Sequence, residues 1–117
     1  MTMKELEEEY LHNAKLHGDL NISNRIANKA AKELIKLNTY MSSNLEIARQ
    51  MVDLIINSDN INAQIWIAGL AIDINYNKEN AIKLLMSLTK NKNIGILAMN
   101  ARGVLVTRKI ISINDRF

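Results

Sequence analysis

Apolar residues recur at steps of three and four along almost the whole chain of 117 residues, and short polar breaks divide this pattern into six segments. Such steps place side chains on one face of an α-helix. The chain contains no proline, and the alternation typical of strands is hard to find outside its last residues. The pattern therefore predicts an all-α fold. The expected helices span residues 3–17, 23–41, 44–57, 61–74, 78–90 and 94–108.

Local capping signals mark the starts of several of these helices. Thr2 followed by Glu5 forms a capping-box pattern, in which each side chain hydrogen-bonds to the backbone N–H of the other residue. Ser43 and Glu46 show the same pattern before the third helix, and Asn77 is placed to cap the fifth. These signals support the starts of the first, third and fifth helices.

The third and fourth helices resemble the fifth and sixth at an offset of 33 residues, with matches such as Ala68 and Ala101. Helix pairs that cannot bury their apolar faces alone form a continuous core when they stack. The alternative is that any two amphipathic pairs align this well, since breaks and caps recur in both. We expect a short right-handed stack of antiparallel pairs. Its parts are a single domain (1–117) with an N-terminal capping pair (1–42), repeats at 43–75 and 76–108, and a tail (109–117).

The inward positions of the helices predict the hydrophobic core. In the second helix, Ile26, Leu34 and Ile35 are expected to face inward. The fourth helix is apolar nearly all round, which is typical of a central helix. Its Trp66 is expected in the core, with an interface anchor as the alternative. The core residues that we expect are Leu34, Met51, Ile55, Ile61, Ile65, Ile72, Leu84, Leu88 and Leu105.

Composition and charge limit the possible functions. The absence of cysteine excludes disulfides and thiolate sites, as is usual in a reducing compartment. The acidic N-terminus is unlike a signal peptide and no apolar run approaches membrane-spanning length, so we expect a cytoplasmic protein. Residues 1–60 hold seven Lys/Arg and nine Asp/Glu, whereas 61–117 hold eight and three. This asymmetry can steer a charged partner.

Short motifs along the chain carry a family resemblance. A polar break at Asp59 and Asn60 precedes a helix in which Trp66 lies between two isoleucines and is followed by Ala68. The later segments add an alanine- and leucine-lined helix from Lys78 to Leu88 and the run Ala101-Arg102-Gly103-Val104-Leu105, and the second helix carries Asn28-Lys29-Ala30. Over residues 5–108 the sequence resembles a family of small bacterial HEAT-like helical-repeat proteins of formally unknown function.

This resemblance implies a fold and a function. The implied fold is a short HEAT- or armadillo-like stack of about six helices. Members of the family are similar to immunity proteins of contact-dependent inhibition and related toxin systems. The resemblance therefore implies a non-catalytic cytoplasmic protein that binds and blocks a cognate bacterial toxin domain.

Candidate residues for chemistry are few. His12 and His17 are the only histidines and lie five residues apart, which places them about 140° apart around a helix and unsuited to binding one metal ion together. No glycine-rich phosphate loop is present, and no triad of nucleophile, base and acid converges in the sequence. We therefore expect no catalytic residues, no metal, no cofactor, no small-molecule substrate and no enzymatic activity.

Two charged faces compete as the partner-binding surface. Many delivered toxins are nucleases with basic clefts, for which an acidic face of the first helix is the better match. That face consists of Glu5, Glu8, Glu9 and His12. The alternative is a basic stripe on the second helix, formed by Arg25, Lys29, Lys32 and Lys36. Nucleic-acid binding through this stripe is the rival function, but no aromatic residues lie nearby for base stacking.

Overall fold

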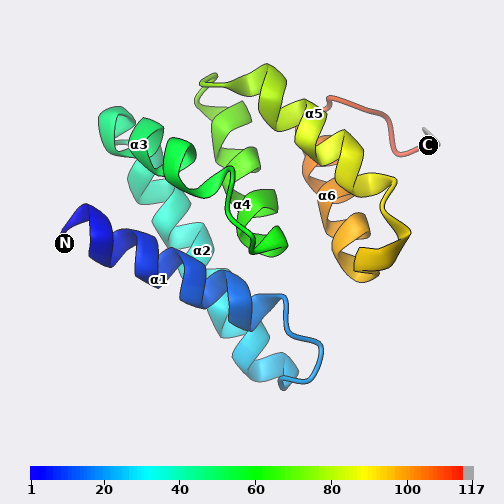
Figure 1. Cartoon of the computed structure of the whole chain (residues 1–117), viewed down its shortest axis with the longest axis horizontal. Coiled ribbons are helices and arrows are strands. Elements are labelled where there is room, and N and C mark those ends of the chain that lie inside the picture. The colour runs from blue at the N-terminus through cyan, green and yellow to red at the C-terminus, as the bar shows by residue number, and fades with distance from the viewer. Residues whose placement is uncertain (115–117) are drawn as a thin grey trace.

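The computed structural model describes residues 1–114 and consists of α-helices joined by short connections (Figure 1). Six α-helices and one 3₁₀ turn occur in this part of the chain. Their bounds are α1 (Met3–His17), α2 (Asn24–Ser42), α3 (Leu45–Ile55), α4 (Ile61–Asp73), α5 (Lys78–Thr89), the turn η1 (Lys92–Ile94) and α6 (Ile96–Thr107). The predicted all-α fold is confirmed.

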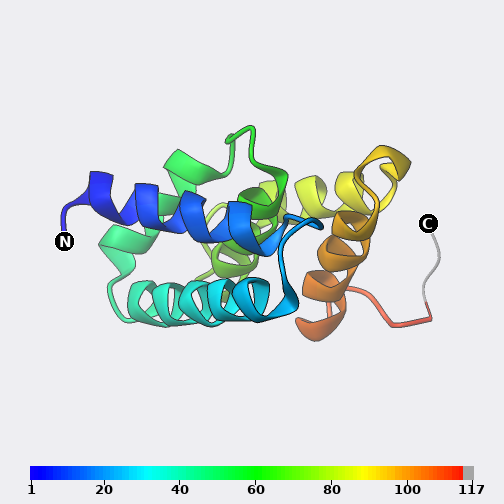
Figure 2. The same cartoon turned by 90° about the horizontal axis from the view of Figure 1, so that it is seen from below.

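Helix α4 lies at the centre of the arrangement. Neighbouring helices pack in chain order, and α4 also packs against α1, α2 and α6. Figure 2 shows α1 and α2 side by side at one end, with α6 at the other. Because α4 has neighbours on several sides, most of its residues from Ala63 to Ile72 are buried. Its apolar sequence therefore reflects its central position.

The predicted helix starts are partly correct. The Thr2 and Glu5 capping box is present at α1, with both side-chain hydrogen bonds formed. The prediction that Ser43 and Glu46 cap α3 is wrong, because Ser43 ends α2 and Asn44 is the residue before α3. The Asn44 side chain instead donates to Tyr40 O and stays with the preceding helix.

Helices α4 and α6 end in the same way. Asn75 and Lys109 both have positive φ, 54° and 59°. In each case the next N–H reaches back five residues, from Tyr76 to Ala71 O and from Ile110 to Leu105 O. This is the Schellman pattern, which satisfies carbonyls at a helix end. Of the predicted tail, residues 109–114 contain no strand, and 115–117 lie outside the described residues.

The start of α6 differs from the prediction of a helix over 94–108. The η1 turn precedes Gly95, which has φ of 59° and ψ of −128°. Glycine reaches such a conformation without a steric penalty, and an α-helix cannot continue through it. The helix therefore begins at Ile96.

The core largely matches the prediction. Ile61 and Leu84 are only partly buried, but the other predicted core residues are buried. Ile26 and Ile35 were predicted inward and are exposed, at 47% and 54%. Ile35 follows Leu34 directly and so points about 100° away from it around the helix. Leu37 and Met41 continue the buried face of α2 instead.

Within residues 1–114, no helix combines the length and the apolar composition that crossing a bilayer requires.

Candidate binding site

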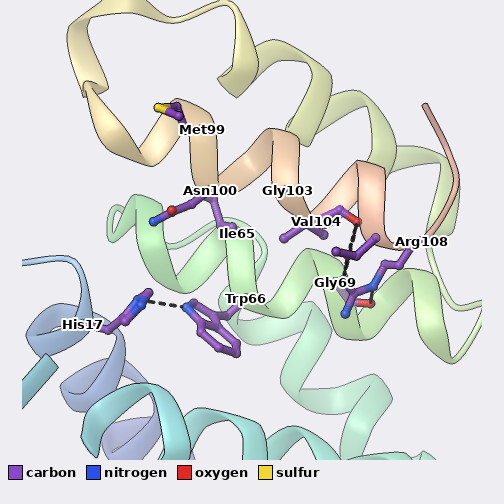
Figure 3. A pocket seen from close by; sticks show the side chains of 10 residues that line it. His17, Ile65, Trp66, Gly69, Met99, Asn100, Gly103, Val104 and Arg108 are labelled. Carbon is purple, nitrogen blue, oxygen red and sulfur yellow. Dashed lines mark hydrogen bonds between the residues drawn. The ribbon is translucent and has the colours of Figure 1, made fainter. Parts of the chain in front are cut away.

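A hollow of about 340 Å³ lies between the end of α1, the middle of α4 and one face of α6 (Figure 3). Its walls are mostly apolar, and its polar side chains are those of His17, Asn100, Thr107 and Arg108. Figure 3 shows His17 at one end and Arg108 at the other. The lining residues are His17, Ile65, Trp66, Gly69, Met99, Asn100, Gly103, Val104, Thr107 and Arg108.

His17 and Trp66 form one end of the hollow. Trp66 Nε1 lies 3.3 Å from His17 Nδ1, and the two rings meet edge to face with centroids 5.4 Å apart. The indole N–H is a donor only, so His17 Nδ1 accepts this hydrogen bond and carries no proton. The proton of the neutral imidazole is therefore on Nε2. Burial lowers the pKa of His17, which favours this neutral form.

Asn62 connects this end of the hollow to the core. Its Nδ2 donates to Ala14 O and lies equally close, 2.9 Å, to His17 Nδ1. Asn62 is buried, and Gly18 packs so closely on it that a Cβ on Gly18 would lie 3.1 Å from Asn62 Cβ. These contacts hold the end of α1 on the first turn of α4. They also fix the orientation of the His17 ring.

Arg108 closes the opposite end. Its Nε and Nη2 donate to the two carboxylate oxygens of Asp73 over 2.8 and 2.9 Å, and Nε also reaches Gly69 O over 3.2 Å. A Cβ on Gly69 would lie 3.0 Å from Arg108 Nη2. Glycine at this position therefore lets the guanidinium lie flat against α4. The charge of Arg108 is balanced within the chain by Asp73.

The rim of the hollow on α6 is open and apolar. Met99 is 71% exposed, and Ile96, one turn earlier on the same face, is 51% exposed. Gly103 lines the hollow from the next turn, and a Cβ there would have no neighbour within 4 Å. Exposed apolar side chains that adjoin a hollow are typical of interaction sites.

The acidic face predicted on α1 is separate from this hollow. Glu5, Glu8 and His12 are exposed and Glu9 is partly buried, all on one side of the helix. Glu5 is engaged in the α1 cap, and the hydrogen bond from the Thr2 backbone lowers the pKa of its carboxyl. The structure thus keeps the four residues together as a surface. Their role in binding stays a prediction.

The basic stripe predicted on α2 also forms one surface. Arg25, Lys29, Lys32 and Lys36 are all exposed. Lys36 forms an ion pair with Glu33 over 3.4 Å, which leaves its charge partly balanced. None of the four lines the hollow. This alternative binding surface also stays a prediction.

Trp66 is the lining residue of the hollow for which the sequence suggested an interface anchor as an alternative to a core position. It was expected in the core, but it is partly buried and forms a wall of the hollow. The reason is that α1 ends at His17 and α6 covers α4 from the other side, so that one side of Trp66 has no helix packed over it. Sequence reasoning missed Met99 and Arg108. Two isolated glycines within apolar helices, Gly69 and Gly103, were the available signal of a close packing or an opening.

The described residues offer no ready metal site. Across residues 1–114, no three His, Asp or Glu side chains come together as ligands. His12 is exposed, whereas His17 is committed to Trp66 and Asn62.

The family resemblance stays a prediction from the sequence. Comparison with protein-family models, curated proteins and solved structures finds no match to this chain.

Proposed function

We propose that this chain is a protein-binding helical module whose cytoplasmic role is to bind and block a bacterial toxin domain, without chemistry of its own. The observation that carries the binding proposal is the half-open apolar hollow with Trp66 in its wall and Met99 exposed on its rim. Aromatic residues and Met are enriched at protein interfaces, and Trp is over-represented among residues whose truncation costs most binding energy.

The proposed architecture suits such a role. We infer that α3–α4 and α5–α6 are two HEAT-like repeats, capped by α1–α2. The matching Schellman ends at Asn75 and Lys109 support this, because they terminate the second helix of each pair. Stacked helix pairs present extended surfaces to a partner. The toxin-blocking part of the proposal rests on the family resemblance.

The experiment is a protection assay. The partner to test is a C-terminal toxin domain encoded directly upstream of this chain. Its induction in bacterial cells should stop growth, and co-expression of this chain should restore it. The purified pair should elute as one complex. Continued growth arrest despite normal levels of this chain, with no complex, would refute the proposal.

The charged faces provide a second, sharper readout. If the acidic face of α1 covers a basic cleft, reversal of Glu5, Glu8 and Glu9 to Lys should slow association and abolish protection. Reversal of the α2 stripe (Arg25, Lys29, Lys32 and Lys36) should leave protection intact. Loss of protection from the α2 reversal alone would assign binding to the basic stripe instead.

Nucleic-acid binding is a second candidate, favoured by one observation. Residues 80–114 contain six Lys/Arg and no Asp or Glu. A chain that uses these charges on phosphates would bind unrelated DNA or RNA, and the logarithm of its affinity would fall linearly with the logarithm of salt concentration. Fluorescence anisotropy with a labelled random duplex at two salt concentrations distinguishes this function from protein binding.

A further inference from the structure

We propose that the hollow between α1, α4 and α6 receives one large apolar side chain from an acidic segment of the partner. This inference rests on the proposed function and adds the place and the chemistry of the contact. Figure 1 shows that α6, which forms one wall of the hollow, lies on the side of the molecule opposite the N-terminus.

The open rim of the hollow favours a single side chain. Sites for complete small molecules and cofactors span about 300–1,000 Å³ and enclose most of the ligand. The hollow measures 340 Å³, near the lower limit of that range, and stays open along Gly103. Apolar surface also continues outside it along Met99 and Ile96. A side chain projecting from a larger apolar contact fits both features.

The lining favours an apolar body. Ile65 and Val104 line the hollow between the His17–Trp66 end and the Arg108 end, and Asn100, beside Ile65, adds one polar side chain there (Figure 3). Arg108 already forms a bidentate pair with Asp73, so it does not require a carboxylate inside the hollow. An aromatic, Leu or Met side chain therefore matches the lining better than an acidic one.

The basic charge near the hollow favours an acidic segment on the partner around the apolar side chain. Residues 80–114, which contain α6 and most of the neighbouring α5, hold six Lys/Arg and no Asp or Glu, and of the six Arg108 is paired with Asp73. Lys92 and Lys109 are exposed. Complementary charge speeds association and sets the register of a contact. The chain's two differently charged ends can thus meet a basic cleft and an acidic segment of the same partner.

Filling the hollow is the direct test. Gly103→Leu adds a side chain where a Cβ meets nothing within 4 Å, so the helix can accept it. Ser87→Leu adds the same side chain to the exposed face of α5 and is the matched control. The probe is the purified toxin domain encoded upstream, titrated by calorimetry. Gly103→Leu should weaken binding about 30-fold or more, as loss of a central anchor does. Ser87→Leu should bind like the parent chain.

Two further variants keep the test independent of how well Gly103→Leu folds. Met99→Lys changes a side chain that is mostly exposed and should also weaken binding. The double variant Lys92→Glu and Lys109→Glu should slow association, with an effect that shrinks as salt is added. Trp66 is the only tryptophan, so its fluorescence should shift when the hollow is filled.

The outcomes separate the inference from the proposed function. Parent-like binding by Gly103→Leu and Met99→Lys, with protection intact, would overturn the inference and leave the function standing. If the parent chain neither binds the domain nor protects cells, both fail. Self-association of the parent chain that Gly103→Leu abolishes, measured by sedimentation, would assign the hollow to a second copy and overturn the inference. Salt-sensitive binding of a random duplex by the basic end would overturn it as well.

Discussion

The two ends of the hollow are held by polar contacts of different kinds. At the α1 end, buried Asn62 joins Ala14 O to a neutral His17. At the α6 end, Arg108 and Asp73 form a partly exposed ion pair over Gly69 O. Breaking a buried hydrogen bond leaves a polar group without water, whereas an exposed ion pair can exchange its partner for solvent. The α1 end should therefore tolerate substitution less well.

The largest loss of stability is expected from Asn62→Leu at the α1 end. The substitution keeps the approximate volume and removes one donor each from Ala14 O, which keeps the Gly18 N–H, and from His17 Nδ1, which keeps Trp66, so we expect the free energy of unfolding to fall by about 1–2 kcal/mol. Asn28→Leu, an exposed change on α2, is the matched control and should shift stability by less than about 0.5 kcal/mol. Urea denaturation at neutral pH measures both. Equal losses for the two variants would contradict a structural role for Asn62.

The free energy of unfolding should also depend on pH through the α1 end, and this effect should be smaller than that of Asn62→Leu. Protonation of His17 places a proton on Nδ1, which faces the Trp66 and Asn62 donors, and burial already lowers the pKa. The unfolded chain therefore takes up this proton first as the pH falls below about 6.5. The stability that neutral His17 contributes should be fully present above that pH. The free energy of unfolding should then decrease as the pH falls toward the folded-state pKa of His17.

The two histidines provide the control for this dependence. His17→Gln should flatten the decrease in stability between about pH 6.5 and 5, where a free histidine takes up its proton. His12→Gln, on the exposed side of the same helix, should preserve it. Thermal unfolding across this range measures the slope for each variant. A slope that survives in His17→Gln would place its origin elsewhere in the chain.

Helix positions were predictable because they depend on local patterns, whereas the hollow depends on how α4 and α6 cross. The apolar residues nearly all round α4 predicted a central helix, as observed. The start of α6 was missed because the positive φ of Gly95 is a backbone state that the surrounding apolar residues do not announce. Ser43 has the residue type and spacing of a capping box at the start of α3, but it lies at the end of α2. Local sequence did not decide between the two helices.

The candidate site was less predictable than the fold. Trp66 was noticed, but its exposed side results from where α1 stops and from the path of α6, which are tertiary features. Met99 looks like any apolar residue in an amphipathic helix, and Arg108 gains its role from Asp73, 35 residues earlier. The pairing of distant residues across helices cannot be derived from spacing alone. A single sequence therefore yields candidate surfaces more readily than a hollow.

The ion pair at the α6 end should contribute less than the Asn62 network. Arg108→Met keeps the apolar stem against α4 and removes the charge, and we expect a loss of about 1 kcal/mol. The loss should shrink at high salt, because salt screens a partly exposed pair. Chemical denaturation with urea at two salt concentrations tests this. A salt-independent loss above about 3 kcal/mol would show that this end is as constrained as the other.

The smallest expected effect is a gain in stability from Gly103→Ala. Glycine within a helix is disfavoured because the unfolded chain loses more conformational freedom on folding. A Cβ at Gly103 meets no atom within 4 Å, so the substitution adds no strain and should stabilise the fold by about 0.5 kcal/mol. Gly69→Ala is the contrasting variant, because its Cβ would lie 3.0 Å from Arg108 Nη2 and should displace the guanidinium, which removes the gain. Thermal unfolding of both variants beside the parent chain measures the difference. A Gly103→Ala variant that is destabilised would mean that α6 packs more tightly over the hollow than its open rim indicates. In that case the Gly103→Leu variant would report on folding, and Met99→Lys would carry the test of binding.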